Sequence, residues 1–172
     1  MRAGAARRAA AAELARALEE ERDACRRLRE GGRKVQAALA AGRTAGVRAA
    51  LAEQDAALRR LERARRRRRE AQELVAGELG LEATSPLGKL LERMPPEEGA
   101  RLADLRRALE EEVRQVSRVN QETMRLVEAF GRYVDFLRDL VQRHERAGVY
   151  TADGRPARSP GSSQARTLSR YR

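Results

Sequence analysis

Few residues of this sequence could do acid–base, nucleophilic or metal chemistry. The 172-residue chain has one cysteine, Cys25, and one histidine, His144. A single cysteine cannot form an internal disulfide, and one cysteine with one histidine cannot supply all the ligands of a zinc site. Cys25 lies on an expected apolar helix face, where a buried and inert thiol is predicted, and His144 lies near an expected helix end. We therefore expect a protein that is not an enzyme and that holds no metal or cofactor.

The composition points to long helices rather than to a compact catalytic domain. Charged residues make up 37% of the chain and aromatic residues only 3%, and Arg and Ala are both abundant. Such a composition is typical of coiled coils and argues against a large aromatic-lined pocket. The sequence has no apolar run of about 18 residues, so we expect no membrane-spanning segment and a cytoplasmic location.

Apolar or small residues recur at alternating spacings of four and three in the first half of the chain. This pattern predicts two helices packed on each other, over residues 8–41 and 44–79, with a tight antiparallel turn at Gly42. The expected contact positions are Leu14, Leu18, Glu21, Cys25, Leu28, Gly32, Val35 and Leu39 on the first helix, and Val47, Leu51, Gln54, Leu58, Leu61, Arg65, Arg68, Gln72, Val75 and Leu79 on the second.

The position of the turn also sets the register of the hairpin. Facing residues should have numbers that add to about 86, because the two helices run antiparallel from the turn. This places Leu51 and Leu58 opposite apolar residues of the first helix, and it places Glu21 opposite Arg65. Arg68 would pack its stem on a leucine of the first helix and keep its guanidinium in water.

Prolines mark two further helices. Ser85 before Pro86 is an N-cap signal, and the Pro95–Pro96 pair both ends one helix and begins the next. We therefore expect a short helix over 86–93 and a long one over 96–146.

Beyond residue 146 the pattern is lost. Residues 147–172 are rich in Gly, Pro, Ser and Arg and show no helical period, which predicts a flexible basic tail. The predicted fold is all-α: residues 1–146 form an elongated antiparallel helical bundle, or coiled-coil hairpin, with one long C-terminal helix, and the disordered tail follows.

The long C-terminal helix carries a wide apolar face from Val113 to Val141. At about 50 residues it would span ~75 Å, whereas each arm of the hairpin would span ~50 Å. Its last apolar residues should therefore have no partner within the chain, and an unpartnered apolar helix face is a binding surface for another protein. The apolar residues expected to have no partner are Tyr133, Val134, Phe136, Leu137, Leu140 and Val141. The alternatives are that the helix bends back or self-associates.

The formal net charge of +11 raises the possibility of a nucleic-acid or anionic-lipid partner, although a coding bias that inflates Arg and Ala together would also produce it. The most basic stretch contains Arg63 and Arg65–Arg69. Five consecutive arginines circle a helix, and Glu62 and Glu70 lie within reach for local pairing. No aromatic residue precedes Phe130 to stack on bases. An Arg-rich nucleic-acid-binding coiled coil and a self-associating structural scaffold are the alternative functions.

Two short motifs lie in the long helix and the tail. Asn120 and Leu126 lie in the segment VSRVNQETMRL, and Tyr150 and Gly154 lie in VYTADG. Together with the long helical hairpin, they resemble the FlgN-like flagellar export chaperones. Members of that family show an Asn-x-x-Asn-x-x-Leu-like stretch and then a Tyr-x-x-x-Gly motif. Thr123 stands here in place of the second Asn.

The resemblance implies a cytosolic chaperone that binds hook-associated (hook–filament junction) proteins, prevents their premature assembly and brings them to the flagellar type III export gate. Independently of the resemblance, the lack of a long apolar run predicts no membrane insertion, and the lack of aromatic residues in the basic half argues against a nucleic-acid partner. The implied gate-docking candidate is Tyr150. The implied substrate-binding residues are Asn120, Leu126, Val127, Phe130, Tyr133, Val134 and Leu137.

Overall fold

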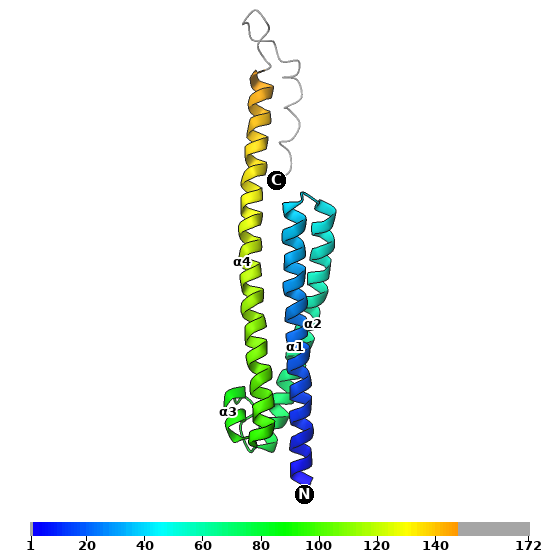
Figure 1. Ribbon diagram of the computed structural model, residues 1–172, viewed down its shortest axis with the longest axis vertical. Coiled ribbons are helices and arrows are strands. Elements are labelled where there is room, and N and C mark those ends of the chain that lie inside the picture. Colours follow the sequence, from blue (N-terminus) through cyan, green and yellow to red (C-terminus); the bar gives the residue numbers. More distant parts are fainter. Residues whose placement is uncertain (1, 148–172) are drawn as a thin grey trace, which may run out of the picture. The chain divides into compact units, whose positions relative to one another are not determined.

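The computed structural model describes the backbone of residues 2–147 and the side chains of residues 4–143. Within this range the regular elements are all helices, which confirms the predicted all-α fold. The chain divides into two units, Met1–Val127 and Glu128–Arg172, and the last helix contributes to both. Ala147, predicted to begin the tail, is the last residue of the final helix, and the rest of the predicted tail lies outside the described residues. The helices are α1 (Arg2–Ala40), α2 (Thr44–Glu78), α3 (Leu87–Arg93) and α4 (Pro96–Ala147) (Figure 1).

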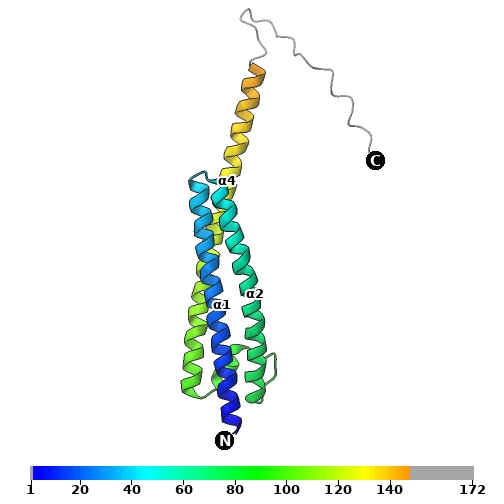
Figure 2. The ribbon, with the colours of Figure 1, turned by 90° about the vertical axis from the view of Figure 1, so that its right-hand side faces the viewer.

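The first two helices form the predicted antiparallel hairpin, and both views show them side by side (Figures 1 and 2). Gly42 takes a φ of 64°, a left-handed conformation that glycine adopts without strain. The N–H of Gly42 donates to the carbonyl of Leu39 at 3.0 Å, and the N–H of Arg43 donates to the carbonyl of Ala38 at 2.9 Å. These bonds satisfy the last carbonyls of α1 and let α2 begin at Thr44.

Most of the buried residues of α2 are alanines rather than leucines. Four buried alanines recur at every seventh position of α2, and α1 has a matching row of buried small residues with the same spacing. Small side chains at facing positions allow two helix backbones to approach closely. The rows are Ala50, Ala57, Ala64 and Ala71 on α2, and Ala10, Ala17, Ala24, Gly31 and Ala38 on α1.

The prediction that Leu51 and Leu58 face α1 is therefore wrong. Their side chains are 49% and 47% exposed, and the alanine that precedes each of them is buried instead. A step of one residue turns a helix by about 100°, which moves these leucines away from the seam. The predicted contact positions Leu61 and Val75 are buried, at 7% and 0% exposure.

The predicted pairing of Glu21 with Arg65 is confirmed. Glu21 is only 4% exposed, and its carboxylate accepts hydrogen bonds from Nε of Arg65 at 3.2 Å and from Nε of Arg68 at 2.7 Å. Arg68 thus does not merely rest its stem on a leucine, as the sequence suggested, but shares the buried carboxylate. A buried charge with two charge-assisted partners is tolerated in a helical seam where an unpaired one is not.

The part of α4 up to Val127 packs on the hairpin within the first unit. Leu102, from the first turns of α4, is 1% exposed and shares a core cluster with Leu14 of α1 and Val75 of α2. Leu90 brings the short helix α3 into the same cluster. A second cluster, nearer the middle of the hairpin, is formed by Ala24, Cys25, Leu28, Ala57 and Leu61, with Leu109 and Val116 packed against it.

Two adjacent glycines let neighbouring helices approach α1 very closely. A Cβ atom added at Gly32 would lie 2.5 Å from Cγ1 of Val119 on α4. One added at Gly31 would lie 2.6 Å from Cγ of Gln54 on α2. The helix continues through both glycines, as the unbroken spacing predicted. Glycine serves here for close packing, because it has no Cβ, and not for a turn.

Candidate binding surface on the long helix

The residues carried over from the family resemblance lie on α4, and their side chains are exposed. Every described side chain from Met124 to Arg143 is exposed, and so is that of Asn120. Large apolar side chains are normally buried, so that such a run of exposed ones makes this part of α4 the candidate binding surface. The exposed fractions are 41% for Leu126, 52% for Val127, 47% for Phe130, 57% for Tyr133, 45% for Val134 and 38% for Leu137.

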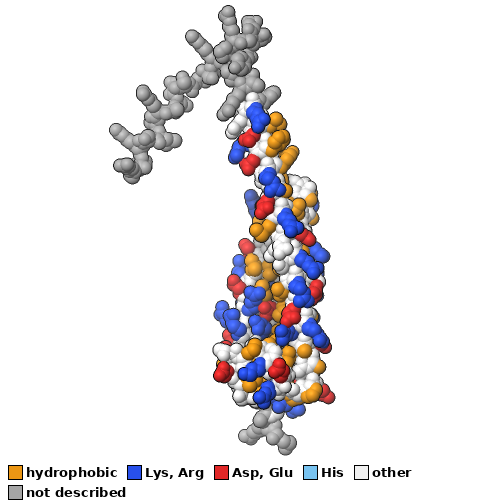
Figure 3. All heavy atoms as spheres, turned by 90° about the vertical axis from the view of Figure 1, so that its left-hand side faces the viewer, with side chains coloured by type: hydrophobic (Ala, Val, Ile, Leu, Met, Phe, Trp, Pro, Cys, Tyr) orange, Lys and Arg blue, Asp and Glu red, His pale blue; other side chains and the backbone are white. Residues whose placement is uncertain are grey.

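These side chains share one face of the helix. Leu126, Phe130, Tyr133 and Leu137 are spaced by four, three and four residues, and Val127 and Val134 are seven residues apart. Residues with these spacings lie above one another along one side of an α-helix. We call this set, extended by Leu140 and Val141, the α4 stripe. Figure 3 shows hydrophobic side chains gathered on one side of the described end of the helix.

No stripe position carries a charge. The charged residues of the same segment lie on the rest of the helix surface, and three acids balance three bases. Two of them, Asp135 and Arg138, form an ion pair of 3.0 Å in which both side chains are 64% exposed. The full charged set is Glu128, Arg132, Asp135, Arg138, Asp139 and Arg143. The stripe can therefore attract a partner mainly by burying apolar area rather than through net charge.

Thr123 binds within the first unit instead of facing a partner. Its hydroxyl donates to the carbonyl of Val119 at 2.7 Å and accepts a hydrogen bond from Nε2 of Gln36 at 3.2 Å. The same Gln36 amide lies 3.1 Å from the Val119 carbonyl and so connects α1 to α4. The residue that replaces the second family Asn thus fastens two helices together, whereas the first, Asn120, is exposed.

Several large apolar side chains of α4 besides the predicted binding residues are also exposed. Met124 and Phe136 are the most exposed large apolar side chains of α4, at 64% and 62%, and Leu140 and Val141 are 51% and 56% exposed. Helix length pointed to Phe136, Leu140 and Val141 as apolar residues beyond the reach of the hairpin, but the sequence reasoning did not point to Met124. Val113 is 43% exposed, although the sequence placed it at the start of the apolar face of this helix. Tyr150 and the side chain of His144 lie outside the described residues.

The residues that could do metal or thiol chemistry are few in the described part of the chain. Among them, no group of three or more His, Cys, Asp or Glu side chains is placed to hold a metal ion. Cys25 is 2% exposed, and burial together with the nearby Glu21 carboxylate raises the pKa of its thiol. A protonated, buried thiol is a poor nucleophile and a poor metal ligand.

The arginine run of α2 is tied to α1 more than the sequence suggested. Arg65 and Arg68 bind Glu21, and both carboxylate oxygens of Glu20 lie 2.9 Å from Nη1 of Arg67. The expected local pairs with Glu62 and Glu70 are absent from the described ion pairs. The arginines reach across the seam because α1 places two adjacent carboxylates there. This uses three arginines of the run for the hairpin itself.

Comparison with known proteins relates the chain to a family and not to an individual protein. None of the described helices is both long and apolar enough to cross a membrane. No curated protein and no solved structure is significantly similar to the chain. The family model for the FlgN protein matches residues 1–158, which include all four helices and the exposed stripe. The chain therefore belongs to the FlgN family, a family of flagellar chaperones.

Proposed function

We propose that this protein is a cytoplasmic export chaperone for hook-associated proteins. It would bind these hook–filament junction subunits before export, keep them from assembling prematurely and deliver them to the flagellar type III export gate. Membership of the FlgN family supports this proposal, and so does the exposed apolar face of α4. The observation that carries it is the α4 stripe, a row of large apolar side chains that are 38–57% exposed.

The stripe fits a helical segment that has an apolar face of its own. Subunits that polymerise through helices expose such faces before assembly, and covering them would prevent assembly without any chemical step. Burying ~600 Å² of apolar surface gives a gross gain of about 15 kcal/mol. The loss of translational freedom and the ordering of side chains offset much of this gain. The complex should therefore be specific but releasable, as delivery requires.

Phe130→Asp tests the proposal on the full-length chain. A charge in the middle of the stripe should weaken binding of a hook-associated protein from the same organism about 100-fold, because a buried aromatic contact is replaced by a desolvated carboxylate. Isothermal titration calorimetry would measure this loss. Leu58→Asp is the matched control, because Leu58 is also an apolar side chain with 47% exposure but lies on α2.

The control should bind the hook-associated protein as the natural chain does. Equal affinities for the Phe130→Asp variant and the natural chain, with both folded by circular dichroism, would remove the stripe from cargo binding. A dimer that is dissociated by Phe130→Asp, with no affinity for any hook-associated protein, would instead favour the structural scaffold.

Delivery to the export gate is the second half of the proposal. Tyr150 matches the family motif that follows the long helix in sequence, and one aromatic side chain can anchor a segment in an apolar pocket of a partner. Its role as the gate-docking residue stays a prediction from the resemblance.

A further inference from the structure

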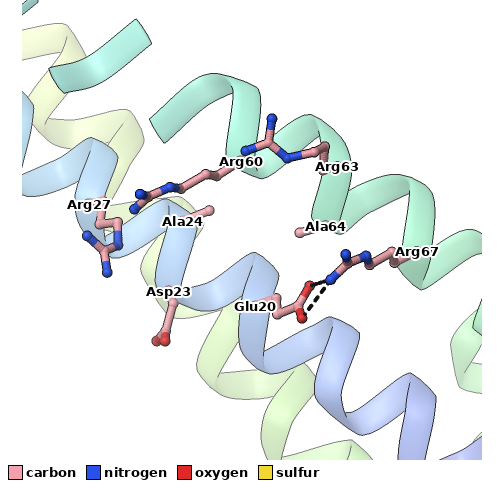
Figure 4. Close-up of a pocket in the computed structure, with 8 residues that line it drawn as sticks. All are labelled: Glu20, Asp23, Ala24, Arg27, Arg60, Arg63, Ala64 and Arg67. Atoms are coloured by element: carbon pink, nitrogen blue, oxygen red, sulfur yellow. Dashed lines mark hydrogen bonds and ion pairs between the residues drawn. The ribbon is translucent and has the colours of Figure 1, made fainter. Parts of the chain in front are cut away.

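A groove runs along the outside of the hairpin, on the seam between α1 and α2. One part, of about 270 Å³, is lined by four residues of each helix, and its floor contains Ala24 and Ala64 (Figure 4). A second part, of about 460 Å³, continues along the same seam past Ala17 and Ala71 and shares Glu20 and Arg67 with the first. The alanine rows that bring the two helices together thus also form the floor of this groove.

The groove lies away from the surfaces that the first unit already uses. Its two parts are lined by α1 and α2 alone. The packing of α4 on α1 instead uses Gly32, Arg29 and Gln36, which contact Val119, Glu112 and Thr123 of α4. The residues of the α4 stripe do not line it. Any partner held in the groove would therefore be additional to one held on the stripe.

The rim of the first part carries more positive charge than the protein itself uses. Glu20 is bound by Arg67, and Asp23 is bound by Arg26 at 2.6 Å, so that both rim carboxylates have arginine partners. Arg27, Arg60 and Arg63 have no carboxylate within 4.0 Å among the described side chains. Figure 4 shows the side chain of Arg60 reaching from α2 toward Ala24 and Arg27 on α1. Three exposed guanidinium groups thus surround an alanine floor.

We propose that this groove docks an acidic helical segment of a partner protein. The carboxylates of the segment would pair with Arg27, Arg60 and Arg63, since guanidinium groups bind carboxylates in a bidentate manner. Its small apolar side chains would rest on Ala24 and Ala64. A groove between two helices can hold a third helix laid along it, which is one of the recurrent ways in which proteins bind helical segments.

The pattern of charges favours such a segment over a nucleic acid. Double-stranded DNA carries a negative charge about every 1.7 Å, so that it needs a uniformly basic track. The rim contains the carboxylates of Glu20 and Asp23, and the second part of the groove adds Glu13 and Glu70. No aromatic residue lies in the first unit to stack on bases. A protein helix can place its acids at one end and neutral groups at the other, which a phosphate backbone cannot do.

The test uses the full-length chain and a fluorescein-labelled alanine-based helical peptide. The peptide carries three Glu at i, i+4 and i+7, so that they share one face, and its counterpart carries Gln at the same positions. Fluorescence anisotropy should show that the Glu peptide binds about tenfold more tightly than the Gln peptide, and that added salt weakens it. Replacing Arg27, Arg60 and Arg63 by Glu should remove this preference.

Matched charge changes elsewhere separate the groove from overall charge. Arg33, Arg48 and Arg118 are exposed and do not line the groove, so that their replacement by Glu gives the same net charge and should keep the preference. Equal losses in the two triple variants, or equal binding of the Glu and Gln peptides, would overturn the proposal. So would a short single-stranded RNA that binds more tightly than the Glu peptide and is lost with the groove arginines.

Two further measurements keep the result independent of folding and of cargo binding. If the Glu triple variant unfolds at a lower temperature than the natural chain, the Gln versions of the same three positions replace it, because they remove the charges without adding repulsion. The groove variant should keep its affinity for a hook-associated protein. The Phe130→Asp variant should keep its preference for the Glu peptide.

Discussion

At the scale of single residues, the buried charge cluster shows what spacing alone can predict. The register expected for the antiparallel hairpin, in which facing residue numbers add to about 86, placed Glu21 opposite Arg65. The structure confirms that pair. Arg68 also binds this carboxylate, at 2.7 Å, because two arginines separated by three residues lie on one side of the helix. The register of the hairpin did not predict this second bond. Spacing gives the level at which residues meet, but side-chain reach decides which of them bind.

Glu21→Leu should leave the free energy of unfolding nearly unchanged or raise it. The leucine would continue the apolar seam, and the guanidinium groups of Arg65 and Arg68 could turn to water because their side chains are 50% and 27% exposed. The double change Arg65→Ala and Arg68→Ala should cost about 3 kcal/mol, since it leaves the carboxylate buried without partners. Urea unfolding monitored by circular dichroism would measure both. The cluster would be of little structural importance if the double variant were as stable as the natural chain.

At the scale of helices, the number and type of elements could be predicted but part of the packing could not. Proline and glycine signals placed α3 and the start of α4 within one residue of where they lie. The leucines of α2 were assigned to the seam because large apolar side chains usually fill contact positions. The alanines fill it instead, with Leu51 and Leu58 exposed. A sequence rich in Ala has several alternative apolar stripes, and only the close approach of the backbones selects one.

The glycine pair of α1 gives a prediction at this scale. Gly32→Ala should lower the free energy of unfolding by about 1–2 kcal/mol, because the stiff Val119 side chain cannot move away from the new methyl group. Gly31→Ala meets Cγ of Gln54, which moves away if that unbranched side chain changes its χ1 rotamer. Its gain in helix propensity, about 1 kcal/mol, should offset any cost. Thermal unfolding of the two variants would show the difference.

A double variant checks that contact. Gly32→Ala combined with Val119→Ala should be more stable than the sum of the two single changes predicts, because the methyl group then fills the space that the valine leaves. Purely additive effects would mean that the two helices do not meet at this point.

At the scale of the whole chain, the first unit is closed and the described part of the second is open. Residues 1–127 bury two core clusters between the hairpin, α3 and the start of α4. The described side chains of residues 128–143 are all exposed. The sequence predicted an apolar face without an intramolecular partner from helix length and period. It could not predict the hydrogen bond between Gln36 of α1 and Thr123 of α4. The two residues are far apart in sequence, and no motif around either of them indicates a partner.

The claim that the α4 stripe receives a hook-associated protein is tested most directly by hydrogen–deuterium exchange of the full-length chain, with and without that protein. In the free chain the amides of residues 128–143 should exchange rapidly, because a helical segment whose side chains are all exposed is only marginally stable. Addition of the hook-associated protein should slow exchange across residues 126–141 and leave α2 unchanged. Slowed exchange confined to α1 and α2, with residues 126–141 as fast as before, would contradict the claim.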